Sequence, residues 1–170
     1  VKNPRVGLLN NGTEDTKGGD MLVETYQMLK ESDLNFVGNI EARDVPAGVC
    51  DVLVTDGFSG NIVLKLTEGV ATSFMGMFKQ VLLKNTMTKL AAMMIKPGLK
   101  ELKKVLDYTE YGGAPLLGIS KPVIKAHGSS NANAIMHALF QAEKFANTGV
   151  TAEIAARLQA TKGARTDADA

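Results

Sequence analysis

Two short apolar runs of this chain each end in a polar, glycine-bearing loop, and these loops hold the residues best suited to chemistry. The first loop, 10–20, contains Gly12, Thr13 and Lys17. A lysine ammonium on a loop that leaves a strand is a compact point cation suited to a phosphate oxygen. The alternative is that Lys17 is an ordinary solvated loop lysine.

The second loop, 56–60, follows the apolar run Val52–Val54 and leads into a helical pattern from Asn61, with Ser59 as the expected N-cap. A strand that enters a helix through a glycine turn directs backbone N–H groups at one point, which suits an anion. Asn61 can add a side-chain donor without adding charge. The expected phosphate or substrate contacts here are Asp56, Gly57, Ser59 and Gly60. A compact strand–helix corner without a ligand is the alternative.

A third polar turn follows the expected strand 122–127, where His127 precedes Gly128, Ser129 and Ser130. A helical pattern begins after this turn, and Ser129 or Ser130 can cap it. We expect these serines and the helix N-terminus to bind the other side of the substrate. His127 would orient them or protonate a leaving group, although it can also be a hydrogen-bonded turn residue.

The elements around these loops indicate an α/β fold with a mostly parallel sheet. Expected strands at 6–10, 35–39 and 52–55 alternate with helices, one of them at 21–30. Ligands of such sheets gather at the carboxyl ends of the strands, where the loops lie. The first strand has no preceding partner, so we expect its sheet neighbours to come from outside this chain. We expect one domain over 1–160 and a disordered tail over 161–170.

The helical pattern after Asn61 does not stay on one face. Its apolar residues recur at steps of four and drift around the helix, so we expect it to lie between elements, meet another subunit or meet lipid. A second helix should follow Asn85 and stop at Pro97, and a third should start at Leu99.

The segment 76–106 is a basic helical excursion. It holds seven lysines and one glutamate, a net charge of +6 within a chain of net charge +1, and five of the eight methionines lie at 75–94. Basic, methionine-rich helices suit an acidic partner or a membrane surface. The alternative is a lysine-coated excursion packed on its own core. The expected carrier-protein or membrane contacts are Lys84, Lys89, Leu90, Met94, Lys96, Lys100, Lys103 and Lys104.

Composition narrows the class of protein further. With 170 residues, 45% hydrophobic and 22% charged, the sequence is typical of a globular protein, and its net charge of +1 does not favour nucleic acid. The single cysteine, Cys50, excludes an intramolecular disulfide and fits a reducing compartment. No apolar run is long enough to span a membrane, and no spacing suggests a metal site or a cofactor.

Five segments in order resemble the bacterial phosphate acyltransferase family, PlsX. They are Leu8–Gly18, Gly38–Asp44, Thr55–Asn61, Tyr111–Gly118 and Lys125–Ser130, and together they span almost the whole chain to its tail. The resemblance implies a three-layer α/β/α fold related to phosphotransacetylases and isocitrate/isopropylmalate dehydrogenases. Because family members are about twice this length, the chain would correspond to their carboxyl-terminal half.

The resemblance also implies an activity and partners. Family members form acyl phosphate from acyl-acyl carrier protein and inorganic phosphate at the start of bacterial phospholipid synthesis, and they work as homodimers. The resemblance therefore implies a cytoplasmic enzyme that needs no cofactor, does not bind nucleic acid and can meet the inner face of the membrane. Lys17, Asn61 and His127 are the expected catalytic residues.

Two rival functions come from other classes. A decarboxylating dehydrogenase on the related fold would need a metal-binding aspartate cluster, and Asp51 and Asp56 are too sparse to form one. A non-catalytic module that docks carrier protein or membrane through 76–106 is the more serious alternative.

Overall fold

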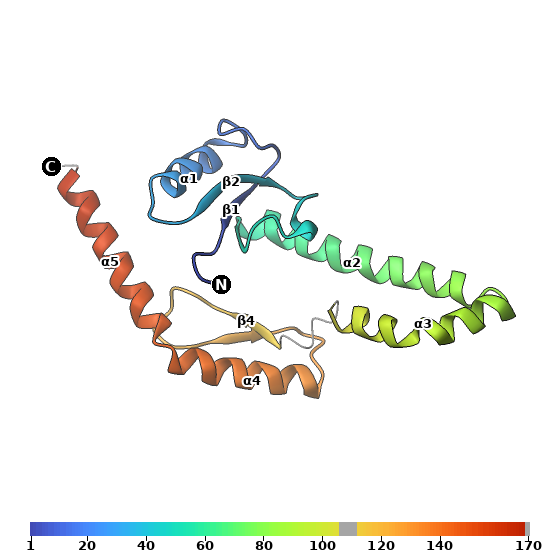
Figure 1. Ribbon diagram of the computed structural model, residues 1–170. Helices are drawn as coiled ribbons and strands as arrows, with labels where there is room; N and C mark the ends of the chain where they lie inside the picture. Colours follow the sequence, from blue (N-terminus) through green and yellow to red (C-terminus); the bar gives the residue numbers. More distant parts are fainter. Residues whose placement is uncertain (106–111, 169–170) are drawn as a thin grey trace. The chain divides into compact units, whose positions relative to one another are not determined.

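The computed structural model describes residues 1–105 and 112–168, and these form two compact units, Val1–Lys84 and Asn85–Ala170 (Figure 1). Side chains are described for residues 1–101 and 112–159. Each of these units has its own sheet, and the single domain expected over 1–160 stays a prediction.

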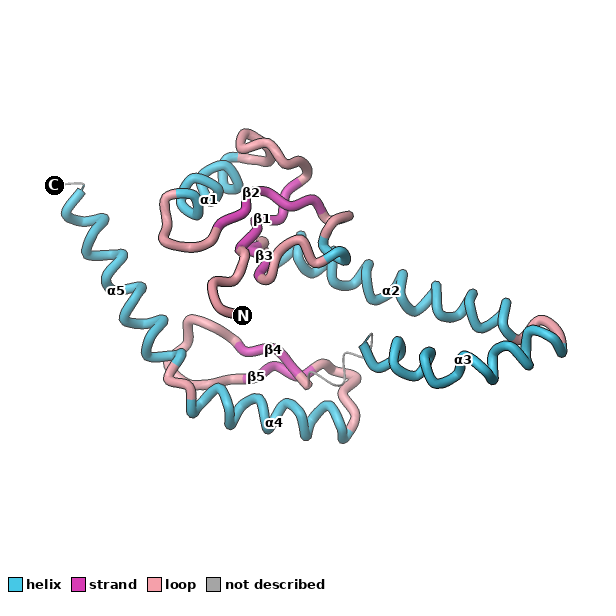
Figure 2. Tube along the Cα trace, in the orientation of Figure 1, coloured by secondary structure: helices cyan, strands magenta, loops and turns pink. Residues whose placement is uncertain are grey.

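The first unit is built on a three-stranded parallel sheet in the order β2-β1-β3, with β1 at Val6–Asn10, β2 at Phe36–Glu41 and β3 at Val52–Val54 (Figure 2). All five residues of β1 are buried, and Leu8 is only 1% exposed. The expectation that the neighbours of β1 lie outside the chain was wrong, because β1 has a partner on each side. Its unbroken apolar run suits this central position.

Helix α1, Asp20–Lys30, lies where the sequence predicts a helix and packs against β2. The rings of Tyr26 and Phe36 meet edge-to-face, with their centroids 5.1 Å apart. A short 3-10 helix, Val45–Ala47, then leads to β3. The Arg5 guanidinium ties the starts of β1 and β3 together, since its Nε donates to Asp51 Oδ2 at 3.0 Å.

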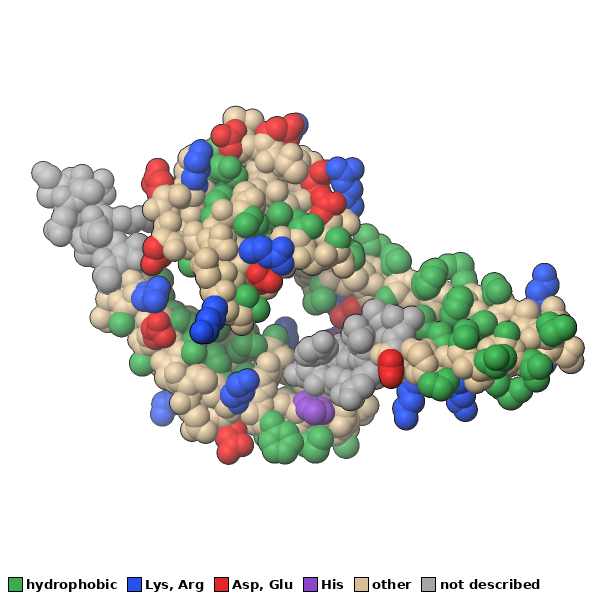
Figure 3. Space-filling view, viewed as in Figure 1, with side chains coloured by type: hydrophobic (Ala, Val, Ile, Leu, Met, Phe, Trp, Pro, Cys, Tyr) green, Lys and Arg blue, Asp and Glu red, His purple; other side chains and the backbone are tan. Residues whose placement is uncertain are grey.

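Helix α2, Gly57–Leu82, completes the first unit. Most of its apolar residues are exposed, including Leu66 at 64%, Val70 at 60% and Phe74 at 57%. Hydrophobic side chains are prominent on its surface in Figure 3. The drifting apolar pattern thus produces an uncovered apolar helix, which is what proteins normally bury against something else.

The second unit contains α3 (Thr86–Val105), β4 (Gly113–Pro115), β5 (Ile124–Ala126), α4 (Ala132–Asn147) and α5 (Val150–Ala168). Strands β4 and β5 are antiparallel and form a separate two-stranded sheet. The sheet of the first unit is parallel, as the sequence predicted. Helix α4 packs on both strands and buries Ala134 and Ala138.

Three local predictions in this unit differ from the structure. Helix α3 continues through Pro97, because proline removes one helical hydrogen bond but does not oblige the remaining ones to break. The N-cap of α4 is Asn131, whose Oδ1 accepts from the Ala134 N–H at 2.9 Å, and not Ser129 or Ser130. Helix α5 runs to Ala168, so it includes most of the segment 161–170 that was expected to be disordered.

Helix α2 ends and α3 begins around Asn85, where the sequence predicted a break between two helices. Asn85 Oδ1 accepts from the Thr88 N–H at 2.9 Å, and the Thr88 hydroxyl accepts from the Asn85 N–H at 3.1 Å. This reciprocal pair begins a new helix. None of the described helices has the length and apolar character needed to cross a bilayer.

Candidate active site at the carboxyl ends of the strands

Both phosphate-suited loops of the first unit leave the same edge of one sheet. Strands β1 and β3 are parallel, with Leu8 opposite Val54, so their carboxyl ends point the same way. The Lys17 loop follows β1, and the turn into α2 follows β3 (Figure 2). The predicted meeting of these two loops at one edge is therefore confirmed at the level of the strands.

The Lys17 loop is fastened to the sheet by two asparagines. Asn10 Nδ2 donates to the Lys17 carbonyl at 2.9 Å, and Asn39 Nδ2 donates to the Glu14 carbonyl at 2.7 Å. The Glu14 carbonyl also accepts from the Lys17 N–H at 3.2 Å. The backbone on both sides of Lys17 is thus fixed, while its side chain is exposed and can reach a ligand.

Gly12 lies under the side chain of Lys17. It is buried, and a Cβ at this position would lie 3.0 Å from both Cγ and Cε of Lys17. The lack of a side chain at Gly12 lets Lys17 lie this close, although both Lys17 and Glu14 are flexible, exposed side chains that could move aside. The ammonium of Lys17 lies 3.8 Å from Glu14 Oε1, an exposed ion pair that a phosphate oxygen can replace at little cost. Thr13 is exposed beside it.

The turn into α2 differs from the prediction. The helix begins at Gly57 and its N-cap is Asp56, not Ser59, because Asp56 Oδ1 accepts from the N–H groups of Phe58 at 2.9 Å and Ser59 at 2.8 Å. Hydrogen bonds from Ser59, chiefly from its side chain, hold the pKa of the Asp56 carboxyl below its usual value.

This cap changes the expected anion site. The Asp56 carboxylate already occupies two first-turn donors, and the Gly60 N–H donates to the Asp56 carbonyl at 3.1 Å. The expected cradle of free N–H groups from Ser59 and Gly60 is therefore wrong for this structure. Gly60 instead allows close packing, since a Cβ there would lie 2.5 Å from Thr55 Cγ2. Asn61 is exposed in the second turn of α2, rather than at its start.

The third predicted turn lies in the other unit, so its joint action with Lys17 stays a prediction. Nδ1 of His127 lies 2.6 Å from Ser129 Oγ and accepts from the Ser129 N–H at 3.2 Å, while the Ser130 N–H donates to the His127 carbonyl at 3.0 Å. Gly128 continues this exposed turn. Ser130 Oγ is buried and has no hydrogen-bond partner within the described residues.

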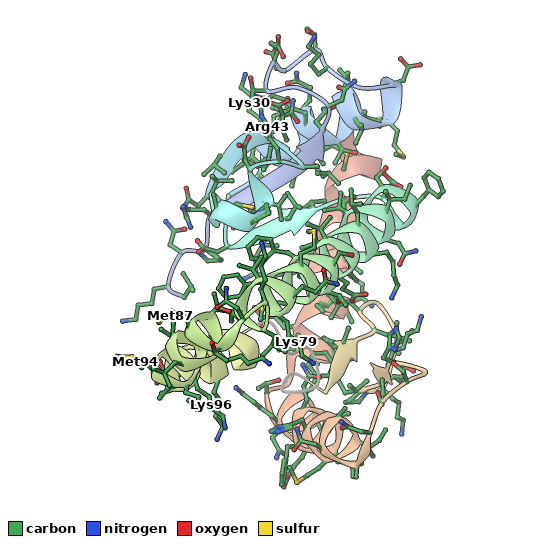
Figure 4. All side chains as sticks on the ribbon, turned by 90° about the vertical axis from the view of Figure 1, so that its right-hand side faces the viewer. Lys30, Arg43, Lys79, Met87, Met94 and Lys96 are labelled. Carbon is green, nitrogen blue, oxygen red and sulfur yellow. The ribbon has the colours of Figure 1, made fainter. Side chains whose placement is uncertain are left out.

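The predicted docking residues of α3 are exposed wherever they are described. Leu90 is 57% and Met94 80% exposed, and Lys89, Lys96 and Lys100 are also exposed, as is Lys84 just before the helix. Met87, Met94 and Lys96 project outward from α3 in Figure 4. Lys103 and Lys104 lie on the same helix, but their side chains are outside the described residues.

Sequence reasoning missed three residues at the carboxyl edge. Asn10 and Asn39 are buried hydrogen-bond donors, but in the sequence they read as ordinary residues of predicted strands. Their polar side chains within mostly apolar runs are the signal that could have identified them. Arg43, just after β2, is the third; it is exposed and pairs with Glu41 at 2.6 Å. Across residues with described side chains, no three acidic, histidine or cysteine side chains gather as a metal cluster.

Taken together, the parallel sheet, the loops at its carboxyl edge and an exposed lysine anchored there define an α/β protein with a site suited to an anion. The profile of the family described as "Fatty acid synthesis protein" matches residues 1–153. The chain belongs to this family.

Curated relatives are similar along most of the chain. A phosphate acyltransferase from Bacillus licheniformis is 54% identical over 159 residues, which cover 94% of this chain and 48% of that protein. A phosphate acyltransferase from Geobacillus sp. is 56% identical over 152 residues, covering 89% of this chain and 46% of that protein. The chain thus spans about half the length of the curated relatives it matches.

Proposed function

We propose that this chain is the carboxyl-terminal half of a phosphate acyltransferase. Such an enzyme transfers an acyl group from acyl-acyl carrier protein to inorganic phosphate in bacterial phospholipid synthesis. The observation that carries the proposal is the Lys17 loop, whose backbone is fastened by Asn10 and Asn39 while the lysine side chain stays exposed. The name phosphate acyltransferase, carried by relatives that are 54% and 56% identical to this chain, supports phosphate as the acceptor of the acyl group.

The chemistry asks for positioning and charge stabilisation. A phosphate oxygen attacks the thioester carbonyl, the carbonyl oxygen becomes an oxyanion, and the thiolate leaves as the intermediate collapses to acyl phosphate. A thiol with a pKa of about 8.5 leaves readily as a thiolate, so a strong general acid is not required. Donors placed before the reaction should therefore dominate the rate.

Each proposed side chain has a distinct role. Lys17 binds phosphate and offsets its charge, and the Asn61 amide donates to the phosphate or to the oxyanion. Asp56 holds the first turn of α2 in place, which fixes the helix on which Asn61 lies. His127 orients Ser129 and Ser130 or protonates the departing thiolate.

Replacing Lys17 tests the assignment directly. In the protein at the full length of its curated relatives, Lys17→Ala should lower the rate of acyl phosphate formation by about a hundredfold or more, as expected for losing one preorganised charged donor. The matched control Lys2→Ala removes another exposed lysine of the same unit and should leave the rate unchanged. A near-normal rate for Lys17→Ala would remove this residue from the site.

The same assay separates the enzyme from the docking module. Acyl phosphate should form with the full-length protein, and comparison with the 170-residue chain alone shows whether this half suffices. If the full-length protein forms no acyl phosphate but still binds carrier protein, the non-catalytic alternative holds.

We further propose that α3 and the nearby Lys84 meet the acidic carrier protein and anionic lipid. The protein would be a cytoplasmic homodimer at the inner face of the membrane. The exposed lysines of 76–106 would steer an acidic partner and raise its rate of association. The exposed Leu90, Met94 and Ile95 would enter the interface while lysines face headgroups. The exposed apolar residues of α2 favour a subunit contact.

Charge reversal should weaken the carrier-protein contact. Lys100→Glu, Lys103→Glu and Lys104→Glu together should slow carrier-dependent turnover several-fold, and more at low salt than at high salt because screening weakens exposed charges. A matched triple with the same charge change, at Lys121, Lys125 and Lys144, should have little effect. Equal slowing in the two triples would show that net charge matters and the α3 surface does not.

Polar substitution should remove the lipid contact. Leu90→Gln, Met94→Gln and Ile95→Gln should abolish co-sedimentation with vesicles that contain anionic lipid, while turnover in solution persists. The control triple changes Ile135, Met136 and Leu139 of α4, which are similarly exposed at 45%, 44% and 66%. Unchanged vesicle binding by the α3 variant would assign its apolar face to a protein contact.

A further inference from the structure

Two buried amides in the first unit have no role in the chemistry above. Asn10, the last residue of β1, is 7% exposed, and Asn39 in β2 is 5% exposed. Asparagine is uncommon at such buried strand positions, because its amide loses its hydrogen bonds to water. Each of these side chains must therefore make a contact that an apolar residue cannot.

Both amides direct their N–H groups at the backbone around Lys17. Asn10 holds the Lys17 carbonyl directly at 2.9 Å. Asn39 holds the Glu14 carbonyl at 2.7 Å, and that carbonyl accepts the Lys17 N–H at 3.2 Å. A carbonyl can only accept, so the NH₂ groups of both amides must face the loop. Two adjacent strands thus fix both backbone polar groups of one lysine.

The other end of Asn39 shows that the amide does not simply fill a polar site in the core. Its Oδ1 is buried and lacks a hydrogen-bond partner among the residues that the structure describes. Burying an unsatisfied acceptor opposes folding, and an apolar side chain of similar shape would avoid this penalty. What an apolar side chain cannot supply is the hydrogen bond from Nδ2 to the loop.

We propose that Asn10 and Asn39 are positioning residues that set the place of the Lys17 ammonium, an inference that rests on the proposed function of Lys17 as the phosphate-binding cation. Without these hydrogen bonds the loop would still form, but Lys17 would be displaced from phosphate. A displacement of about 1 Å can lower a rate roughly a hundredfold. The loss should fall on the kinetic constants for phosphate and spare KM for the acyl carrier protein.

The decisive variant is Asn39→Leu in the full-length protein. Leucine has a similar shape and removes both the donor and the unsatisfied acceptor, so the melting temperature should stay the same or rise. The value of kcat/KM for phosphate should nevertheless fall at least about tenfold. Asn35→Leu is the matched control, because Asn35 Nδ2 also donates to a backbone carbonyl, that of Asn3, but not to the Lys17 loop.

A second variant covers the case in which Asn39→Leu does not fold. Asn10→Asp keeps the shape and removes the N–H donor to the Lys17 carbonyl. The same fall in kcat/KM for phosphate is expected. Variants whose kcat/KM for phosphate equals that of the parent would overturn the proposal, as would a rise in KM for acyl-acyl carrier protein equal to the rise in KM for phosphate.

A double-mutant comparison separates this proposal from the one on which it rests. If Asn39 acts through Lys17, then Asn39→Leu should cause no further loss in a Lys17→Ala background, whereas independent effects would multiply. Multiplying effects overturn the positioning role. If Lys17→Ala is itself as active as the parent, the phosphate-site assignment fails instead. An impaired Lys17→Ala beside a fully active Asn39→Leu overturns only the role of the asparagines.

Discussion

The Lys17 loop and the His127 turn both follow strands, but they are held in different ways. Asn39 and the Glu14 carbonyl that it holds lie 25 residues apart in the sequence, and Asn39 reaches the loop only because β2 pairs with β1. The described bonds of the His127 turn join near neighbours, as between His127 and Ser129 at 2.6 Å. Its strand belongs to a two-stranded antiparallel sheet.

The comparison indicates which of the two regions depends on the folded sheet for its position. Bonds between distant residues form only when the sheet forms, so the position of Lys17 depends on the whole first unit. A hydrogen bond between near neighbours, such as that from the Ser129 N–H to His127, can form without a sheet. We therefore expect catalysis to depend more strongly on the carboxyl edge of the first unit than on the His127 turn.

The largest expected effect is the difference in turnover lost when one residue of each region is replaced. In the full-length protein, Asn61→Ala should lower turnover about a hundredfold, as expected for a lost preorganised donor. His127→Ala should cost less than about tenfold, because a thiolate leaves without much help from an acid. Steady-state rates of acyl phosphate formation measure both. A larger loss for His127→Ala would reverse the ranking and make this turn the catalytic centre.

A smaller effect compares the helix caps that follow the two strands. Asp56→Ala and Asn131→Ala should each lower the free energy of unfolding by about 1 kcal/mol, measured by urea denaturation, since each removes an N-cap. Only Asp56→Ala should also lower kcat/KM for phosphate, because α2 carries Asn61. Asp56→Asn keeps a capping oxygen and should recover most of the stability. Equal kinetic losses for both alanine variants would erase the predicted difference between the regions.

The smallest effect concerns the pair at the opposite ends of β1 and β3 from the site. Hydrogen bonding by Arg5 lowers the pKa of the Asp51 carboxyl from 3.8 to about 2. A carboxyl with a lowered pKa stabilises the fold above its unfolded pKa, and that stability disappears as the pH falls through the folded pKa. The difference in unfolding free energy between the parent and Asp51→Asn should therefore be constant above about pH 5 and shrink towards pH 2.

Urea unfolding at a series of pH values measures this difference. Arg5→Gln removes the partner cation and should give the same flattened pH dependence. A difference that stays constant down to pH 2 would mean that the ion pair does not hold the two strands together.

Local signals in the sequence predicted much of the first unit. The mostly apolar run Val6–Asn10 predicted a strand, and a helix was predicted at 21–30, where α1 lies. The loops with Lys17 and Asp56–Gly60 were expected at strand ends, and the parallel register confirms their shared edge. These features depend on side-chain pattern and turn chemistry, which neighbouring residues determine.

Other predictions failed because competing local signals were balanced. Ser59 and Asp56 can both cap a helix, and the carboxylate at Asp56 is the one that reaches two N–H groups of the first turn. Pro97 disfavours a helix but does not forbid it, and the flanking residues continue α3. The sequence predicts the type of element in such cases better than its end.

By itself, the sequence determined the strands, the loops that follow them and the exposed lysine that could bind phosphate. Only the tertiary structure decided that β1 lies between β2 and β3, and hence that the amides of Asn10 and Asn39 meet at the backbone of Lys17. The reason is physical: a hydrogen bond across 25 residues is not encoded in any local pattern. It exists only when strand pairing brings the donor and the carbonyl together.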